Sequence, residues 1–197
     1  MMVDADIFTE EAMTRPLFEE LAAHHAREDE WSGPHGFAFG GMMQADIASL
    51  AEEYFAAADE LVEAIKDKRI ADYRIANAAL FLYRHSCELI LKAALPQKKR
   101  THDLVELTDS FVEIVETRYE QDVPQWIVRR LRELASIDPQ STAFRYGEYH
   151  RPMAGSDTPI DFEAYISLPH LQAAMLALRT ALIGAVAEIE NMGAWQP

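Results

Sequence analysis

The chain has 197 residues, a mass of 22.3 kDa and a formal net charge of −15. This length can bury a sizeable core, and the single cysteine, Cys87, excludes an intramolecular disulfide and any multi-thiolate metal centre. Residues 1–67 carry 16 acidic and three basic residues, whereas residues 68–197 carry 17 and 15. A uniformly acidic chain would argue against nucleic-acid binding, because phosphate contacts need Lys and Arg. Here the acidic excess is confined to the first third of the chain, where a solvated acidic face is the simplest interpretation.

No targeting or membrane segment is expected. The N-terminus is acidic and lacks a basic stretch followed by apolar residues. The longest apolar tract, residues 171–187, is interrupted by Gln172, Arg179 and Thr180, so it is too polar and too short to span a bilayer. We therefore expect a cytoplasmic protein with no membrane partner.

The first third of the chain predicts an extension. Thr14 with Pro16 predicts the start of a helix that reaches about residue 28. Residues 31–41 then hold four glycines and a proline among aromatic residues, which is typical of a loop. We place the domain boundary here, with an acidic helical extension and loop at 1–42 and the main domain at 43–197.

The main domain reads as long helices. Helical spacing of apolar residues predicts helices over 44–68 and 71–95, and the broad apolar arc of the second suggests a central place in the core. Further helices are expected at 102–119, 122–137 and 168–192.

Residues 138–167 are irregular. The aromatic and β-branched segments 144–149 and 162–167 can pair as a short hairpin around a turn at 155–159. The expected fold is an all-α, up-and-down bundle of four to five long helices, with a short hairpin or irregular excursion before the last helix.

Known chemical motifs are missing from the sequence. Di-iron bundles need Glu three residues before His, and none of the seven histidines has one. No His pair has metal-ligand spacing and no glycine loop has the phosphate-binding pattern. Cys87 lies on an apolar helix face, where an inert core thiol is expected. We therefore expect neither a metal nor a cofactor.

Two neighbouring polar groups stand out. Arg84, Glu88 and Lys92 are spaced four residues apart and form one polar row on an apolar helix. A solvated row of ion pairs, worth about 0.2–0.5 kcal/mol each, is the simplest interpretation, and a functional surface is the alternative. His102 and Asp103 follow at a helix start, where they can cap the first turn and orient the imidazole.

At these residues the sequence resembles the HEPN superfamily of small all-helical prokaryotic domains. The resemblance rests on the segment SCELILKA at 86–93, on His102-Asp103-Leu104 at a helix start, and on residues 143–146 with Asp138-Pro139 before them. The resemblance covers roughly residues 70–190. The order and spacing of these segments are similar to those of uncharacterised bacterial members of that superfamily.

The resemblance implies a possible activity. Many HEPN proteins are dimeric, metal-independent endoribonucleases of toxin–antitoxin or phage-defence systems that carry an Arg shortly before a His. Arg145 and His150, with four residues between them, match this pair. His would move the proton and Arg would stabilise the phosphate, in a site shared by two copies. A packing role is the alternative, because in an extended strand the two side chains converge only if the chain bends at Gly147.

Two basic clusters, Lys98-Lys99-Arg100 and Arg129-Arg130 with Arg132, can bind phosphate or simply be solvated. The candidate binding residues are Arg84, Glu88, Lys92, Lys98, Lys99, Arg100, His102 and Asp103.

Three functions remain open. We expect first a non-catalytic, homodimeric HEPN-like binding or interaction module linked to a toxin–antitoxin or phage-defence system, with RNA, a nucleotide or another protein as candidate partners. The alternative is a metal-independent endoribonuclease that uses Arg145 and His150. The third is a small-molecule-binding protein in which the aromatic residues 31–39 lie over the bundle.

Overall fold

The computed structural model describes residues 9–18, 45–96, 99–147, 150–152, 159–161 and 164–193. The chain divides into two compact units, Met1–Gln44 and Ala45–Pro197, and each is described by itself.

The described part of the first unit contains one short helix, α1 (Glu10–Thr14). Thr9 starts it by accepting a hydrogen bond from the backbone N–H of Ala12 at 3.0 Å. The expectation that a helix begins at Thr14 is wrong, because α1 ends there. Pro16 has no N–H and restricts the residue before it, so it stops this helix instead of opening the next. Residues 19–28 and the loop at 31–41 lie outside the described residues.

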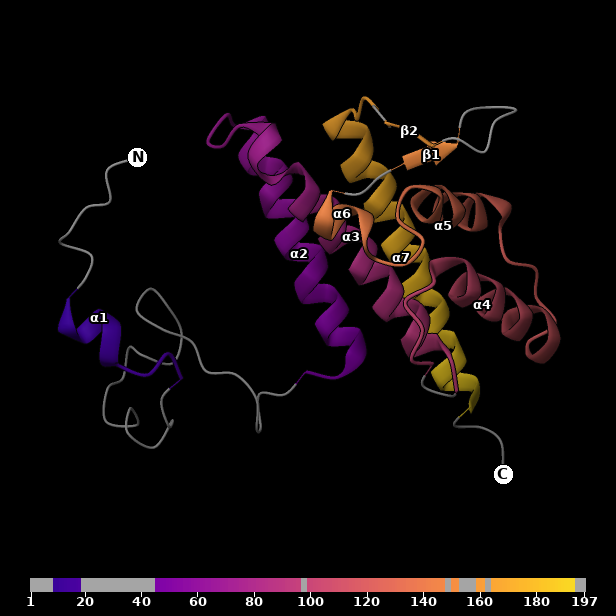
Figure 1. Cartoon of the computed structure of the whole chain (residues 1–197). Helices are drawn as coiled ribbons and strands as arrows, with labels where there is room; N and C mark the ends of the chain where they lie inside the picture. The colour runs from indigo at the N-terminus through magenta and orange to yellow at the C-terminus, as the bar shows by residue number, and fades with distance from the viewer. Residues whose placement is uncertain are drawn as a thin grey trace. The chain divides into compact units, whose positions relative to one another are not determined.

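The second unit begins with two long neighbouring helices, α2 (Ile47–Lys66) and α3 (Asp72–Ala94), which lie side by side (Figure 1). Asp46 caps α2 by accepting a hydrogen bond from the N–H of Ser49 at 2.7 Å. The connection between the helices is short, so they pack as an antiparallel pair.

Helix α3 is the central helix of the bundle. It packs against α2, α4 (Leu104–Arg118), α6 (Ala143–Tyr146) and α7 (Leu168–Gly193), while α5 (Gln125–Ile137) packs against α4 and α7. The largest fully buried apolar side chains of the core are Tyr83, Ile90, Leu91, Leu104, Leu107, Phe111, Leu131, Leu178 and Leu182. The expected all-α bundle of long helices is confirmed, and the broad apolar arc of α3 reflects its contacts on several sides.

The excursion before α7 contains a short antiparallel hairpin of β1 (His150–Pro152) and β2 (Pro159–Asp161). The expected strands of this hairpin are wrong, because residues 144–146 belong to α6, residues 164–167 form no strand, and the paired residues are 150–152 and 159–161. Asp138 Oδ1 accepts hydrogen bonds from the N–H groups of Thr142 at 2.6 Å and Ala143 at 3.0 Å, so this carboxylate starts the helical turn. Burial of Phe144 then holds it against the core.

Helix α7 is unusually apolar. Among the described helices it alone is long and apolar enough, by length and composition, to cross a membrane, over Leu168–Ile189, and 22% of that window is buried. The expectation that this tract is too polar and too short to span a bilayer is therefore wrong on those two criteria. Two polar side chains nevertheless attach it to α2. Arg179 Nε donates to Glu52 at 2.9 Å, and Gln172 Nε2 donates to Glu63 at 2.9 Å. These contacts explain which face of α7 belongs to the bundle.

Candidate functional site

A cluster of charged side chains lies between α3, the start of α4 and the end of α5. We call Arg84, Glu88, Lys92, His102 and Asp138 the α3 polar cluster. The side chains of Arg84, Glu88 and Asp138 are fully buried, and that of Lys92 is 12% exposed. The interpretation of a solvated ion-pair row is therefore wrong, because the segments around His102 and Asp138 cover this face of α3.

Arg84 connects three segments through its guanidinium group. Its Nη1 donates to Glu88 Oε2 at 2.6 Å, its Nε to the carbonyl of Asp138 at 2.8 Å, and its Nη2 to the carbonyls of His102 at 2.6 Å and Pro139 at 3.0 Å. Such fixed N–H groups match several acceptors at once. Arg84 therefore holds the backbone before α4 and the backbone after α5 against α3.

Glu88 is the anion at the centre of the cluster. Its Oε1 accepts a hydrogen bond from Lys92 Nζ at 2.7 Å and lies 2.8 Å from His102 Nδ1. Burial alone would raise the pKa of this carboxyl, but the surrounding groups of His85, Lys92, Arg84 and His102 outweigh it and hold the pKa well below its ordinary value. Glu88 is therefore ionised at neutral pH.

His102 is the part of the cluster that reaches solvent, with a side chain 57% exposed. Ionised Glu88 can only accept a hydrogen bond, so His102 Nδ1 carries the hydrogen and Nε2 keeps its lone pair in the neutral ring. Asp103 caps α4, accepting from the N–H groups of Val105 at 2.9 Å and Glu106 at 3.1 Å. The expected capping role of Asp103 is confirmed, but Glu88 orients the imidazole.

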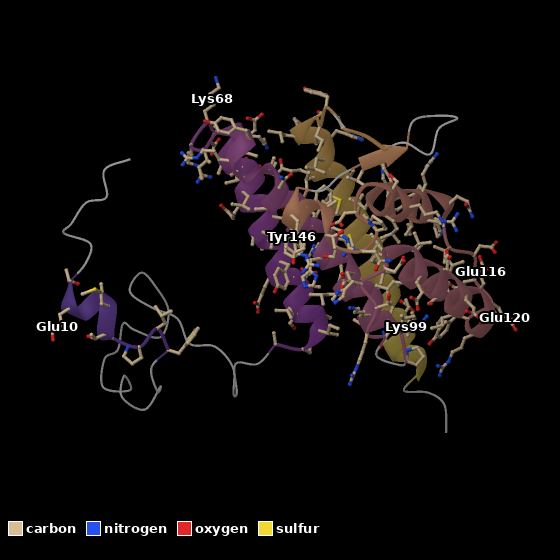
Figure 2. All side chains as sticks on the ribbon, in the orientation of Figure 1. Glu10, Lys68, Lys99, Glu116, Glu120 and Tyr146 are labelled. Atoms are coloured by element: carbon tan, nitrogen blue, oxygen red, sulfur yellow. The ribbon has the colours of Figure 1, made fainter. Side chains whose placement is uncertain are left out.

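Arg145 lies on α6, next to the same face of α3. Its guanidinium lies 5.9 Å from the centre of the Phe81 ring and 5.4 Å from that of Tyr146, and its Nε donates to the carbonyl of Ser141. Figure 2 shows nitrogen atoms gathered beside Tyr146, where α6 meets α3. Helix α3 thus brings the Glu88, His102 and Arg145 segments into one compact unit. His150 belongs to β1, and its side chain lies outside the described side chains.

His85 is a site neighbour that sequence reasoning missed. Its ring stacks on Phe81 with a centroid distance of 5.5 Å and meets the edge of Tyr54 at 4.7 Å. Its Nδ1 is buried without a hydrogen-bond partner among the described residues and lies 3.8 Å from Glu88 Oε2. His85 lies three residues before Glu88, which places both side chains on one face of the helix, and this spacing could have identified His85 from the sequence. Asp138 was singled out only as part of the pair Asp138-Pro139 before the HEPN-like residues 143–146, and no local pattern placed it beside Arg84.

The basic clusters are partly neutralised. Lys99 pairs with Glu106 at 3.0 Å, and its hydrogen bond lowers the pKa of that carboxyl. Arg130 pairs with Glu133 at 2.6 Å, and Arg132 pairs with Asp109 at 3.2 Å. Arg100 and Arg129 are exposed and form no ion pair with the described residues, and Lys98 lies outside them.

Two other chemistries find no support in the described residues. No group of three or more His, Cys, Asp or Glu side chains among them is placed to hold a metal ion. Cys87 is buried, and desolvation raises its pKa to about 12, which keeps the thiol protonated and unreactive.

The chain matches none of the family models, curated proteins or solved structures with which it was compared.

Proposed function

We propose that this protein is a non-catalytic, homodimeric HEPN-like binding and interaction module of the cytoplasm, linked to a toxin–antitoxin or phage-defence system. The all-α bundle and the order of the three HEPN-like segments on it support this proposal. The observation that carries it is an exposed apolar face on α7.

Residues of α7 at helical spacing form this exposed face. They are Pro169, Ala173, Leu176, Ala177, Thr180, Gly184, Ala187 and Asn191. All of these side chains are uncharged, and Leu176 is the one large apolar side chain among them. Leu176 is 51% exposed. The Thr180 hydroxyl donates to the carbonyl of Leu176 at 2.8 Å, so its hydrogen is satisfied within the helix. Continuous apolar surface of this kind marks an interaction site.

A second copy of the chain is the partner that this face fits best. Small side chains allow two helices to approach closely, and the same face on each copy gives a closed dimer. The residues of this face carry no charge themselves, and Leu176 lies away from the charged groove that Ala173 and Ala177 line with Arg129, Arg130 and Arg132. The exposed charged residue Glu188 borders the face and can stay in water at its edge.

Within the module, the α3 polar cluster supports a binding surface. Arg84 and Glu88 are fully buried, so they act on a partner only through the groups they hold. The groups left to contact RNA, a nucleotide or a protein are the exposed His102 with the edge of Lys92 and the basic residues around Arg100.

Light scattering tests the homodimer. The wild type is expected at twice the 22.3 kDa chain mass, and Leu176→Arg at the mass of one chain, because the new charge would be buried in the interface. Val105→Arg is the matched control, since Val105 is 39% exposed on α4. A monomeric wild type, equal dissociation by both variants, or a wild type that binds neutral lipid vesicles through Leu176 would refute the proposal.

A second candidate, the metal-independent endoribonuclease, is favoured by one observation. Gly147 has a left-handed φ of 70° and turns the chain between Arg145 and His150. An extended strand would splay these two side chains apart, and this turn removes that obstacle.

Incubation of the protein with mixed RNA in EDTA tests this activity. Cleavage by the wild type that is lost in His150→Ala and kept in Tyr73→Ala supports it, since Tyr73 is 85% exposed and lies outside every candidate site. Absence of cleavage by the wild type, or equal cleavage by His150→Ala, excludes it.

A further inference from the structure

An open cavity of about 710 Å³ lies between α3, α5, α6, α7 and residues 164–167. Most of the described residues that line it are apolar. They include Leu80, Leu134, Ile137, Phe144, Ile166 and Met175. The volume falls in the range of roughly 300–1,000 Å³ that is typical of small-molecule sites.

The charged side chains and the one histidine among the described lining residues are Arg130, Glu133 and His170, and they lie on one side of this cavity, where α5 faces α7. Arg130 and His170 line both the cavity and an outer groove between these two helices. Arg130 Nη1 donates to Glu133 at 2.6 Å, and its Nη2 lies 3.3 Å from His170 Nε2. Arg130 therefore has N–H groups left over, and with Nε2 accepting, the Nδ1–H of His170 is also free to donate.

The outer groove adds positive charge to this side. Arg129 and Arg132 line it together with Arg130, whereas Glu133 is the one acidic residue among its described lining residues. A net positive rim is notable in a chain whose formal charge is −15. Charge therefore favours a ligand with an anionic end, and the apolar interior favours an uncharged chain on the same molecule.

We propose that this cavity binds a small amphiphile with a single apolar chain and an anionic carboxylate or phosphate head. The head contacts Arg130 and His170, and the chain packs against Leu80, Phe144 and Met175. Charge-assisted hydrogen bonds at the rim select the anion, and burial of the chain supplies the affinity. This site is separate from the exposed α7 residue Leu176 on which the proposed dimer depends.

Calorimetric titration of the full chain tests this binding. Decanoate and decyl phosphate are the anionic probes, and decyltrimethylammonium is the control with the opposite charge, all below the concentrations at which they form micelles. We expect saturable binding of an anion and no saturable binding of the cation. Binding of one anion alone identifies the head group and supports the proposal. Failure of both anions, or equal binding of the cation, overturns it.

Matched variants test the location. Ala76 lines the cavity, whereas Ala78 is exposed on the same helix and does not line it. Ala76→Trp fills the space and should abolish anion binding, and Ala78→Trp should preserve it. Unchanged binding by Ala76→Trp would overturn the proposal, provided that circular dichroism shows both variants folded.

The head-group contact has its own pair of variants. Arg130→Gln is expected to weaken anion binding about tenfold, the effect of losing a charge-assisted hydrogen bond. Arg132→Gln is the control, because Arg132 lines only the outer groove and already pairs with Asp109. Equal losses in the two variants would contradict a head group at Arg130. Leu176→Arg should retain wild-type affinity, so failure of the dimer and failure of this site are distinguishable.

Discussion

Arg84 and Glu88 lie one helical turn apart on α3, and neither side chain is exposed to solvent. Removing two charges from water is costly, and their attraction offsets that cost only when hydrogen bonds satisfy the remaining polar atoms. The guanidinium group of Arg84 donates hydrogen bonds to four acceptors. The carboxylate of Glu88 contacts Lys92 and His102 as well as Arg84. The pair is therefore part of a connected network between three segments.

Removal of Arg84 should expose the dependence of the fold on this network. Arg84→Met leaves Glu88 as a buried charge and frees three carbonyl groups, so we expect the free energy of unfolding to fall by about 3–5 kcal/mol. Arg132→Met breaks a surface pair and should cost less than about 1 kcal/mol. Urea unfolding followed by circular dichroism measures both, and similar losses would show that burial of Arg84 contributes little.

The lowered pKa of Glu88 predicts a pH dependence of stability. Its ionisation stabilises the folded state above its ordinary pKa of 4.5, and this contribution is lost as the pH falls below that value toward the folded-state pKa. The difference in unfolding free energy between the wild type and Glu88→Gln should therefore stay constant from pH 7 down to about 5 and shrink as the pH falls below 4.5. Urea titrations from pH 7 to about 3 test it, and a difference that does not shrink below pH 4.5 would contradict ionisation of Glu88 as the cause.

At the scale of elements, the end of α6 depends on the backbone conformation of Gly147, its C-cap residue. Gly147 has a φ of 70°, whereas Gly184 has no such φ and lies within α7, and a Cβ added at either glycine would meet no atom within 4 Å. Steric conflict is therefore absent in both, and only conformational preference distinguishes them. A side chain disfavours the left-handed region and favours the helix.

This contrast predicts opposite effects of the same substitution. Gly147→Ala should destabilise the protein by about 1–2 kcal/mol, and Gly184→Ala should stabilise it by about 0.5–1 kcal/mol. Both are best measured by thermal unfolding in the Leu176→Arg background, where association through the α7 face does not contribute. Effects of the same sign would show that the conformation at residue 147 is not left-handed in solution.

The helices also show what local sequence patterns can predict and what they cannot. The apolar spacing of α2, α3 and α7 predicted long helices, because periodic burial is a property of the helix itself. The segment from Phe144 to Tyr146 has strand-forming residues but is helical, because Asp138 caps it and the core receives Phe144. Asp138 and the core residues around Phe144 lie outside this short segment, so its own sequence does not reveal them.

At the scale of the whole molecule, charge should oppose association. Each chain carries a formal charge of −15, so two copies repel each other at long range although the α7 face is uncharged. Raising the ionic strength from about 50 mM to about 500 mM shortens the screening length and should tighten the proposed dimer several-fold. Sedimentation equilibrium measures this constant. Weaker association at high salt would instead indicate an interface held by ion pairs.

The sequence alone determined the all-α class, the number of long helices, the central place of α3 and the alignment of Arg84, Glu88 and Lys92 on one face of it. All of these follow from spacing along a single helix. Only the tertiary structure decided that this face is buried, that Asp138 and His102 complete its hydrogen bonds, and that Arg145 lies beside α3. Burial and partner choice depend on residues far apart in the chain, and local periodicity carries no information about them.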